Sequence, residues 1–227
     1  MSLELWQWII TLVAGAITLI IAIYSWNRLR AASWIMVGWF ALSLTLSRVG
    51  FFTGEPSWVT GDLVRFMVFG TVMALPLVGF FATWTRLPRF RTFWENLTLG
   101  QLTAIQVYRV AGVIFFWMNA NDLMPSQIGI FTGLADLTVG VTAIPLAWIL
   151  ARNSGWVKKF AIGWHIFGIA DFLVAVSMVS LSIFGILNLD PAPTMIGVHP
   201  LALISLFQLP LSIAIHSLAL RMLIDRK

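Results

Sequence analysis

Two similar stretches each place one acidic residue inside a long apolar segment. Residues 133–142 read GLADLTVGVT, and residues 168–177 repeat them loosely as GIADFLVAVS, with the Gly, the Ala, the Asp and both Val residues identical. Each copy therefore carries one carboxylate, Asp136 or Asp171, among apolar neighbours. A charge at the centre of a bilayer costs about 2.5–3.5 kcal/mol, so a chain that keeps two such acids is expected to use them.

The composition around these stretches is that of a membrane protein. Of the 227 residues, 59% are hydrophobic and 10% are charged, whereas soluble domains carry about 25% charged residues. The apolar runs lack the alternation of apolar and polar residues that is typical of barrel strands, so we predict an all-α integral membrane protein. The chain has no cysteine, which excludes disulfides, thiolate metal sites and thiol catalysis.

The apolar runs predict seven transmembrane helices that occupy nearly the whole chain. They are expected at approximately residues 5–24, 33–52, 62–84, 99–118, 126–150, 160–187 and 197–222. A helix needs about 20 apolar residues to cross a bilayer, which each run provides. The connections are short, so we interpret residues 1–227 as a single transmembrane domain.

One connection, residues 85–98, differs from the others. Arg86, Arg89 and Arg91 alternate there with apolar and aromatic residues such as Trp94. This pattern is typical of an interfacial segment that lies on an anionic lipid leaflet. Because these arginines adjoin membrane spans, we do not expect them to bind nucleic acid.

The distribution of basic residues predicts the orientation of the chain. If the N-terminus lies outside, eleven Lys and Arg residues fall on the inner side and two on the outer side. The inner residues are Arg28, Arg30, Arg86, Arg89, Arg91, Arg152, Lys158, Lys159, Arg221, Arg226 and Lys227, and the outer ones are Arg48 and Arg65. The positive-inside rule then predicts an outer N-terminus and a cytoplasmic C-terminus, in the plasma membrane of a bacterium.

A layer of polar residues is expected near the middle of the bilayer. At 1.5 Å per residue, Arg109, Asp136, Asp171 and Gln208 each lie about ten or eleven residues from one end of their helices. Gln106 shares the face of Arg109, three residues earlier. Three charges facing lipid would together cost about 8–10 kcal/mol, so we predict that they face inward and meet.

A charge count gives this layer a functional interpretation. Arg109 alone cannot neutralise two ionised aspartates, so either one Asp is protonated or a cation completes the site. A protonatable acid at the midplane beside a fixed arginine is what a proton-coupled carrier needs. We therefore predict a carrier of a small solute or ion, in which Asp136 and Asp171 titrate or bind a cation and Arg109 is the fixed counter-charge.

The two stretches also have alternative interpretations. Their helices are expected to be antiparallel, so Asp136 and Asp171 could be related by the pseudo-twofold axis of an inverted-repeat transporter. A simpler interpretation is that Gly133, Gly140 and Gly168 let helices pack closely and that the charged cluster only fixes that packing. The protein would then be a non-catalytic structural subunit of a membrane complex or a homo-oligomer.

Two histidines suggest a second functional class. His165 and His216 fall at similar depths in the inner half of the last two predicted helices. They are candidates for the axial pair of a b-type haem, or for part of a quinone pocket, in a redox membrane subunit. A hydrogen-bonded packing role is the alternative.

Other features narrow the interpretation of the last helix. Pro210 is expected to leave the carbonyl of Leu206 without its helical partner. His199, at the outer end of this helix, is expected to be interfacial. The helix has no lysine for a retinal Schiff base, and no metal-ligand, phosphate-binding or catalytic-triad motif occurs, so we do not expect an enzyme.

Overall fold

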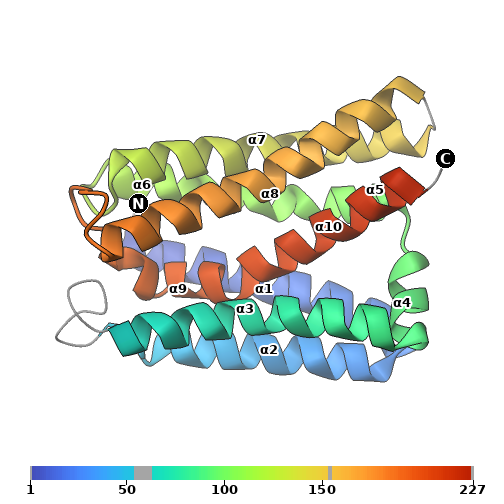
Figure 1. Cartoon of the computed structure of the whole chain (residues 1–227), viewed down its shortest axis with the longest axis horizontal. Coiled ribbons are helices and arrows are strands. Elements are labelled where there is room, and N and C mark those ends of the chain that lie inside the picture. The colour runs from blue at the N-terminus through green and yellow to red at the C-terminus, as the bar shows by residue number, and fades with distance from the viewer. Residues whose placement is uncertain (1, 54–62, 153–154, 226–227) are drawn as a thin grey trace.

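The protein is a bundle of long helices that run along one common axis. The computed structural model describes residues 2–53, 63–152 and 155–225, of which 84% are helical and none is in a strand. The two termini lie at opposite ends of the bundle (Figure 1). The prediction of an all-helical chain is therefore confirmed for these ranges.

Five long helices are continuous, and two further membrane-length segments are interrupted. The continuous ones are α1 (Leu3–Trp26), α2 (Arg30–Arg48), α3 (Leu63–Arg86), α7 (Ser126–Ala151) and α8 (Gly155–Ile183). The first interrupted segment consists of α5 (Leu99–Ala104), the 3-10 helix η1 (Ile105–Gly112) and α6 (Val113–Asn119). The second consists of α9 (Leu201–Leu203), the π-helical turn η3 (Ile204–Gln208) and α10 (Leu209–Asp225).

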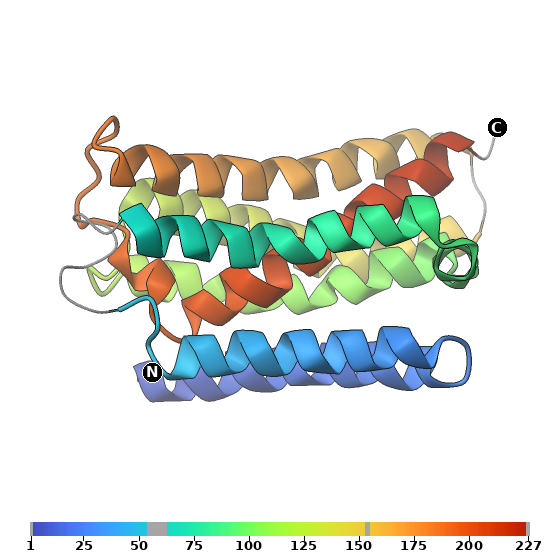
Figure 2. The same ribbon diagram turned by 60° about the horizontal axis from the view of Figure 1, so that its bottom comes forward.

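Six helical segments in the described part of the chain are long and apolar enough to cross a membrane. They are Leu3–Trp26, Phe66–Arg86, Leu99–Asn119, Ser126–Ala151, Trp156–Ile183 and Leu201–Asp225. The helix expected over 33–52 is present as α2, which lies beside α1 (Figure 2), but it is not one of the six. It has only 19 residues and an arginine at each end, and several serines lower its hydropathy.

Several predicted helix boundaries differ from the observed ones by three to five residues, as in α2 and in α8, which was expected over 160–187. The last span begins at Leu201 rather than at 197, because the short 3-10 helix η2 (Thr194–Gly197) and a turn precede it. The segment 85–98 contains a short helix, α4 (Pro88–Glu95), which lies across the end of the bundle (Figures 1 and 2). Pro88 starts α4 at a position where its missing N–H is not needed.

The last segment forms the centre of the bundle. Of its most apolar 18-residue stretch, 78% is buried inside the protein, whereas the corresponding figure for α3 is 6%. It crosses the other helices obliquely (Figure 1). Its π turn precedes Pro210, which cannot donate to the carbonyl of Leu206, and Trp39 of α2 donates its indole N–H to that carbonyl at 3.0 Å.

His199 connects the start of the last segment to α1 and α2. Its side chain is buried inside the protein, 6% exposed, and its expected depth at the membrane interface stays a prediction. The Thr11 hydroxyl donates to Gln7 O at 2.6 Å, so its oxygen accepts from His199 Nε2, 3.3 Å away. His199 Nδ1 then accepts from the Ser47 hydroxyl at 2.8 Å. The imidazole is therefore neutral, and both of its nitrogens have hydrogen-bond partners.

We predict that this histidine makes the fold sensitive to mild acid. Burial and the charge of Arg48 lower the pKa of His199 from 6.5 to about 4. Between these two values the unfolded chain binds a proton that the folded chain does not, so stability falls as the pH falls through this window. Thermal unfolding in detergent should show a smaller loss between pH 7 and pH 4.5 for His199→Gln than for the wild type. An identical loss in both proteins would refute the assignment.

Candidate functional site

The interrupted segment between Leu99 and Asn119 positions the arginine of the site. A capping box starts it, because the Thr98 side chain accepts from Gln101 N and the Gln101 side chain accepts from Thr98 N. The 3-10 helix η1 then runs for eight residues, although such helices rarely exceed four. A 3-10 helix has three residues per turn, so Gln106 and Arg109, three residues apart in η1, lie on the same face of it.

Arg109 of η1 holds one carboxylate from each of the two antiparallel helices that follow. Its Nε donates to Asp136 Oδ1 of α7 at 2.5 Å, and its Nη2 donates to Asp171 Oδ2 of α8 at 2.5 Å. Its Nη1 lies 3.2 Å from both Gly168 O and His216 Nε2. All three charged side chains are buried. The predicted meeting of the charges is thus present as a buried Arg/Asp polar site.

An aromatic ring covers one face of the guanidinium. The Arg109 carbon Cζ lies 4.2 Å from the centre of the Phe172 ring, a cation–π arrangement. Phe172 directly follows Asp171, so α8 supplies both an anion and a π face to the same cation. Nothing in the sequence distinguished this phenylalanine from the many aromatic residues that only fill space.

Glycines from three elements make room for the cluster. A Cβ at Gly112 would lie 2.8 Å from the Asp136 carboxylate carbon, and one at Gly140 would lie 2.9 Å from the Arg109 carbonyl carbon. A Cβ at Gly168 would lie 2.5 Å from His216 Cε1. The glycines at 140 and 168 therefore admit backbone and side chains of η1 and α10 to the site.

A directional hydrogen-bond chain leads away from the arginine. Since a guanidinium only donates, His216 Nε2 accepts from Arg109, and the proton of this neutral imidazole sits on Nδ1. His216 Nδ1 donates to His165 Nδ1 at 2.8 Å, which leaves the His165 proton on Nε2, 3.4 Å from Thr103 Oγ1. The Thr103 hydroxyl donates to Leu99 O at 2.8 Å.

This chain has a defined place in the bundle. Leu99 is the first residue of α5, so the chain runs from the buried arginine to the end of the bundle where α4 and the C-terminus lie (Figure 1). Thr103 lies six residues before Arg109 and was missed in the sequence, where a threonine inside a helix usually bonds only its own backbone. Here it does both.

The two histidines do not fit the predicted haem site. An axial pair must have the iron and the porphyrin plane between its two coordinating nitrogens. His165 and His216 instead hydrogen-bond to each other directly, and their ring centres are 5.0 Å apart. Both nitrogens of both rings already have partners within the chain, so neither ring has a nitrogen free for a quinone carbonyl. This arrangement does not favour the haem or quinone assignment of the pair, which stays a prediction.

The two predicted glutamines lie at different distances from the ion cluster. Gln106 Oε1 accepts a hydrogen bond from the Ser212 hydroxyl at 2.8 Å. Among the described residues, no hydrogen bond joins Gln106 to Arg109. Gln208 lies closer, because it lines a cavity of about 10 Å³ together with Arg109 and Asp136. That volume is about the room that one water needs. Tyr108, a residue missed in the sequence, donates its hydroxyl to Gln208 O at 3.1 Å.

Some buried polar atoms at the site remain without a partner in the described part of the chain. They are Asp171 Oδ1, Thr132 Oγ1 and the amide nitrogens of Gln106 and Gln208. Buried polar groups are nearly always hydrogen-bonded, and each exception asks for an explanation. Every nitrogen of the Arg109 guanidinium already has a partner, so Arg109 does not satisfy Asp171 Oδ1. This oxygen can still accept a proton or a hydrogen bond.

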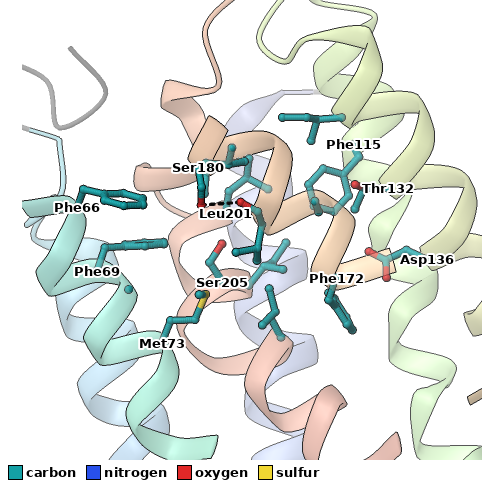
Figure 3. A pocket seen from close by; sticks show the side chains of 18 residues that line it. Phe66, Phe69, Met73, Phe115, Thr132, Asp136, Phe172, Ser180, Leu201 and Ser205 are labelled. Atoms are coloured by element: carbon teal, nitrogen blue, oxygen red, sulfur yellow. Dashed lines mark hydrogen bonds between the residues drawn. The ribbon is translucent and has the colours of Figure 1, made fainter. Parts of the chain in front are cut away.

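A larger cavity lies on the other side of Asp136. It has a volume of about 230 Å³ and is bounded by α3, α6, α7, α8 and the start of the last segment. Phe66, Phe69 and Phe115 line its wall, and the Asp136 carboxylate lies at one end (Figure 3). The ion cluster therefore borders an apolar chamber on one side and the histidine chain on the other.

Six apolar helices around a buried Arg/Asp site make the chain compatible with a multi-span membrane protein. The chain belongs to the family described as Domain of unknown function (DUF8737), whose model matches residues 66–224. The match includes every residue of the ion cluster and of the histidine chain. No curated protein and no solved structure matches the chain.

We predict that a methyl group at Gly168 destabilises the protein. The Gly168→Ala side chain would collide with His216 and lie 3.1 Å from Arg109 Nη1, which should cost about 1–3 kcal/mol through overpacking. Gly163→Ala is the matched control on the same helix, since its Cβ meets nothing within 4 Å. It should raise stability by up to about 1 kcal/mol through helix propensity. Thermal unfolding in detergent measures both, and equal effects would refute the close approach.

Proposed function

We propose that the protein is a proton-coupled carrier of a small solute or ion. The supporting observation is the charge imbalance at the buried cluster, where Arg109 meets the two carboxylates of Asp136 and Asp171. With both acids ionised the cluster has a net charge of −1, which is costly in a low-dielectric interior. A proton or a cationic group restores neutrality, and exchange between the two couples their movements.

The proposed carrier crosses the membrane seven times, with α2 as the crossing that follows α1. Termini at opposite ends of the bundle require an odd number of crossings, which supports seven rather than six (Figure 1). Basic residues gather at the end where α4 and the C-terminus lie, namely Arg28, Arg30, Arg86, Arg89, Arg91, Arg152, Lys158, Lys159 and Arg221. This end is the proposed cytoplasmic side. Arg226, Lys227 and the side chain of Arg65 are outside the described residues.

The histidine chain is the proposed proton path to that side. His216 and His165 are neutral, and each donates one hydrogen bond and accepts another. Such a chain passes a proton when the imidazoles exchange their protonated nitrogens in turn. It runs from the first residue of α5 through Thr103 and the two imidazoles to Arg109. Because a guanidinium keeps its protons, the last transfer, from His216 to a carboxylate of the cluster, would pass through a water molecule and not through Arg109. A carrier of this kind works in a membrane that sustains a proton gradient, such as the bacterial plasma membrane.

The charge imbalance predicts how aspartate substitutions affect transport. In proteoliposomes that hold a pH-sensitive dye, a panel of amines, amino acids and carboxylates should contain a solute that drives proton movement. Asp136→Asn and Asp171→Asn should each slow that movement at least tenfold while the protein stays folded, since each variant leaves Arg109 with one carboxylate. Asp122→Asn is the control, because Asp122 is exposed and asparagine tolerates its positive φ of 55°. Unchanged movement in both site variants would refute the carrier.

The proton path predicts a separation of two activities. His165→Gln keeps hydrogen-bonding groups but cannot relay a proton, so proton-driven uptake should fall at least tenfold. Exchange of labelled for unlabelled solute needs no net proton transfer and should stay within about twofold of the wild-type rate. Equal losses of both activities would indicate a structural role for His165 instead.

A structural role for the whole cluster has one observation in its favour. Every nitrogen of the Arg109 guanidinium already has a partner within the chain. The protein would then be a non-catalytic subunit, and both Asp→Asn variants would keep its partners and leave every transport signal at the background level of empty liposomes.

A further inference from the structure

The walls of the chamber beside Asp136 are mostly apolar. Besides the three phenylalanines that line its wall, Met73 and Phe172 face it, together with aliphatic residues of α7, α8 and the last segment (Figure 3). Among the described residues that line it, Asp136 is the sole charged one, and none is basic. Thr132, Ser180 and Ser205 also line it (Figure 3), so the chamber is mostly apolar and aromatic, with a few hydroxyl groups and one acidic end.

Asp136 is the member of the ion cluster that faces this chamber. Its side chain keeps 8% of its surface accessible, whereas that of Asp171 keeps 0%. Its Oδ1 accepts from Arg109, and Gly112 leaves space beside the rest of the carboxylate. Phe172 lies between the chamber and the arginine, because the ring lines the chamber and also stacks on the guanidinium. A ligand in the chamber would meet the acid and not the base.

The charge of the cluster selects the ligand class. An anion would meet the ionised carboxylate and a cluster that is already net negative. A cation supplies the missing charge, and aromatic faces within about 6 Å of a cation attract it. Apolar substituents on that cation would pack against the chamber wall. A small hydrated ion such as Ca²⁺ takes about six to eight oxygen ligands, whereas four oxygen-bearing side chains from the described part of the chain line this chamber, namely Asp136, Thr132, Ser180 and Ser205.

We propose that this chamber binds a monovalent organic cation with apolar substituents, its charge against Asp136 and its apolar groups among the phenylalanines of α3 and α8. The exchange of this cation for a proton on the cluster rests on the proposed carrier function, while the binding itself does not. An alkyl chain of a lipid is the competing occupant, and it differs from the proposed ligand in having no charge at the acidic end.

Binding of benzyltrimethylammonium to the purified protein in detergent tests the site. Its charge is permanent, and neopentylbenzene is its neutral isostere, so equilibrium dialysis of the two isolates the contribution of charge. We expect the cation to bind at least tenfold more tightly than the isostere, and at least tenfold more weakly to Asp136→Asn than to wild type or Asp122→Asn. Equal affinities for the cation and its isostere would assign the chamber to lipid and overturn the proposal.

A second pair of variants tests the place of binding without touching the charged cluster. Gly70 lines the chamber, and a Cβ there meets nothing within 4 Å, so Gly70→Leu should fill the chamber and weaken the cation's binding at least tenfold. Gly79→Leu is the control on the same helix, with equally open surroundings outside this chamber. Equal binding to both variants would overturn the placement.

The outcomes separate this proposal from the carrier function. If the cation binds at Asp136 but moves no protons in proteoliposomes, the site stands and the carrier fails. If an unrelated solute moves protons in an Asp136-dependent way and the cation does not bind, the carrier stands and the ligand class is wrong. Release of about one proton per bound cation, measured in weak buffer, would support both.

Discussion

The position of one arginine between two buried carboxylates constrains the rest of this structure. Removal of one partner from a buried ion pair typically costs about 3–5 kcal/mol, because it leaves a buried charge unpaired. Arg109 and its two acids therefore have to stay together, and they join η1, α7 and α8 at one point. The backbone is shaped to permit the contact. The segment that carries Arg109 tightens into a 3-10 helix, and glycines remove the side chains that would stand in the way. The last segment widens into a π turn close to the same depth.

The sequence predicted the ion cluster but not its surroundings, for identifiable reasons. Burial of charge in lipid is so costly that depth alone was enough to predict that Arg109, Asp136 and Asp171 meet. The interruptions of the two helical segments were not predictable, because they depend on contacts with helices distant in sequence. His165 and His216 were correctly matched in depth, but depth cannot distinguish two ligands facing each other across a metal from two rings in direct contact. Six of the seven expected spans coincide with helical segments long and apolar enough to cross a membrane, and α2 is the helix whose serines and terminal arginines leave it outside these six.

The cluster lies between two environments of opposite character. On one side the neutral histidines form a chain of hydrogen bonds with a fixed direction, which suits a proton. On the other side an aromatic chamber ends at Asp136, which suits a larger and less hydrated charge. In the proposed carrier, either a proton from the histidine chain or a cation from the chamber supplies the missing positive charge. Binding of one excludes binding of the other, because the cluster lacks only one positive charge. A purely structural ion cluster would require neither the directional chain nor the chamber.

The central claim is that the cluster lacks one positive charge and takes up a proton when no cation is bound. Infrared spectroscopy of the ligand-free protein in lipid detects the C=O stretch of a protonated carboxyl group and follows it as the pH is raised. The wild type is predicted to show one buried protonated carboxyl near neutral pH, and Asp136→Asn and Asp171→Asn are each predicted to lack it, since the remaining acid pairs with Arg109. A wild-type protein without that band, or a band that persists in both variants, would contradict the claim.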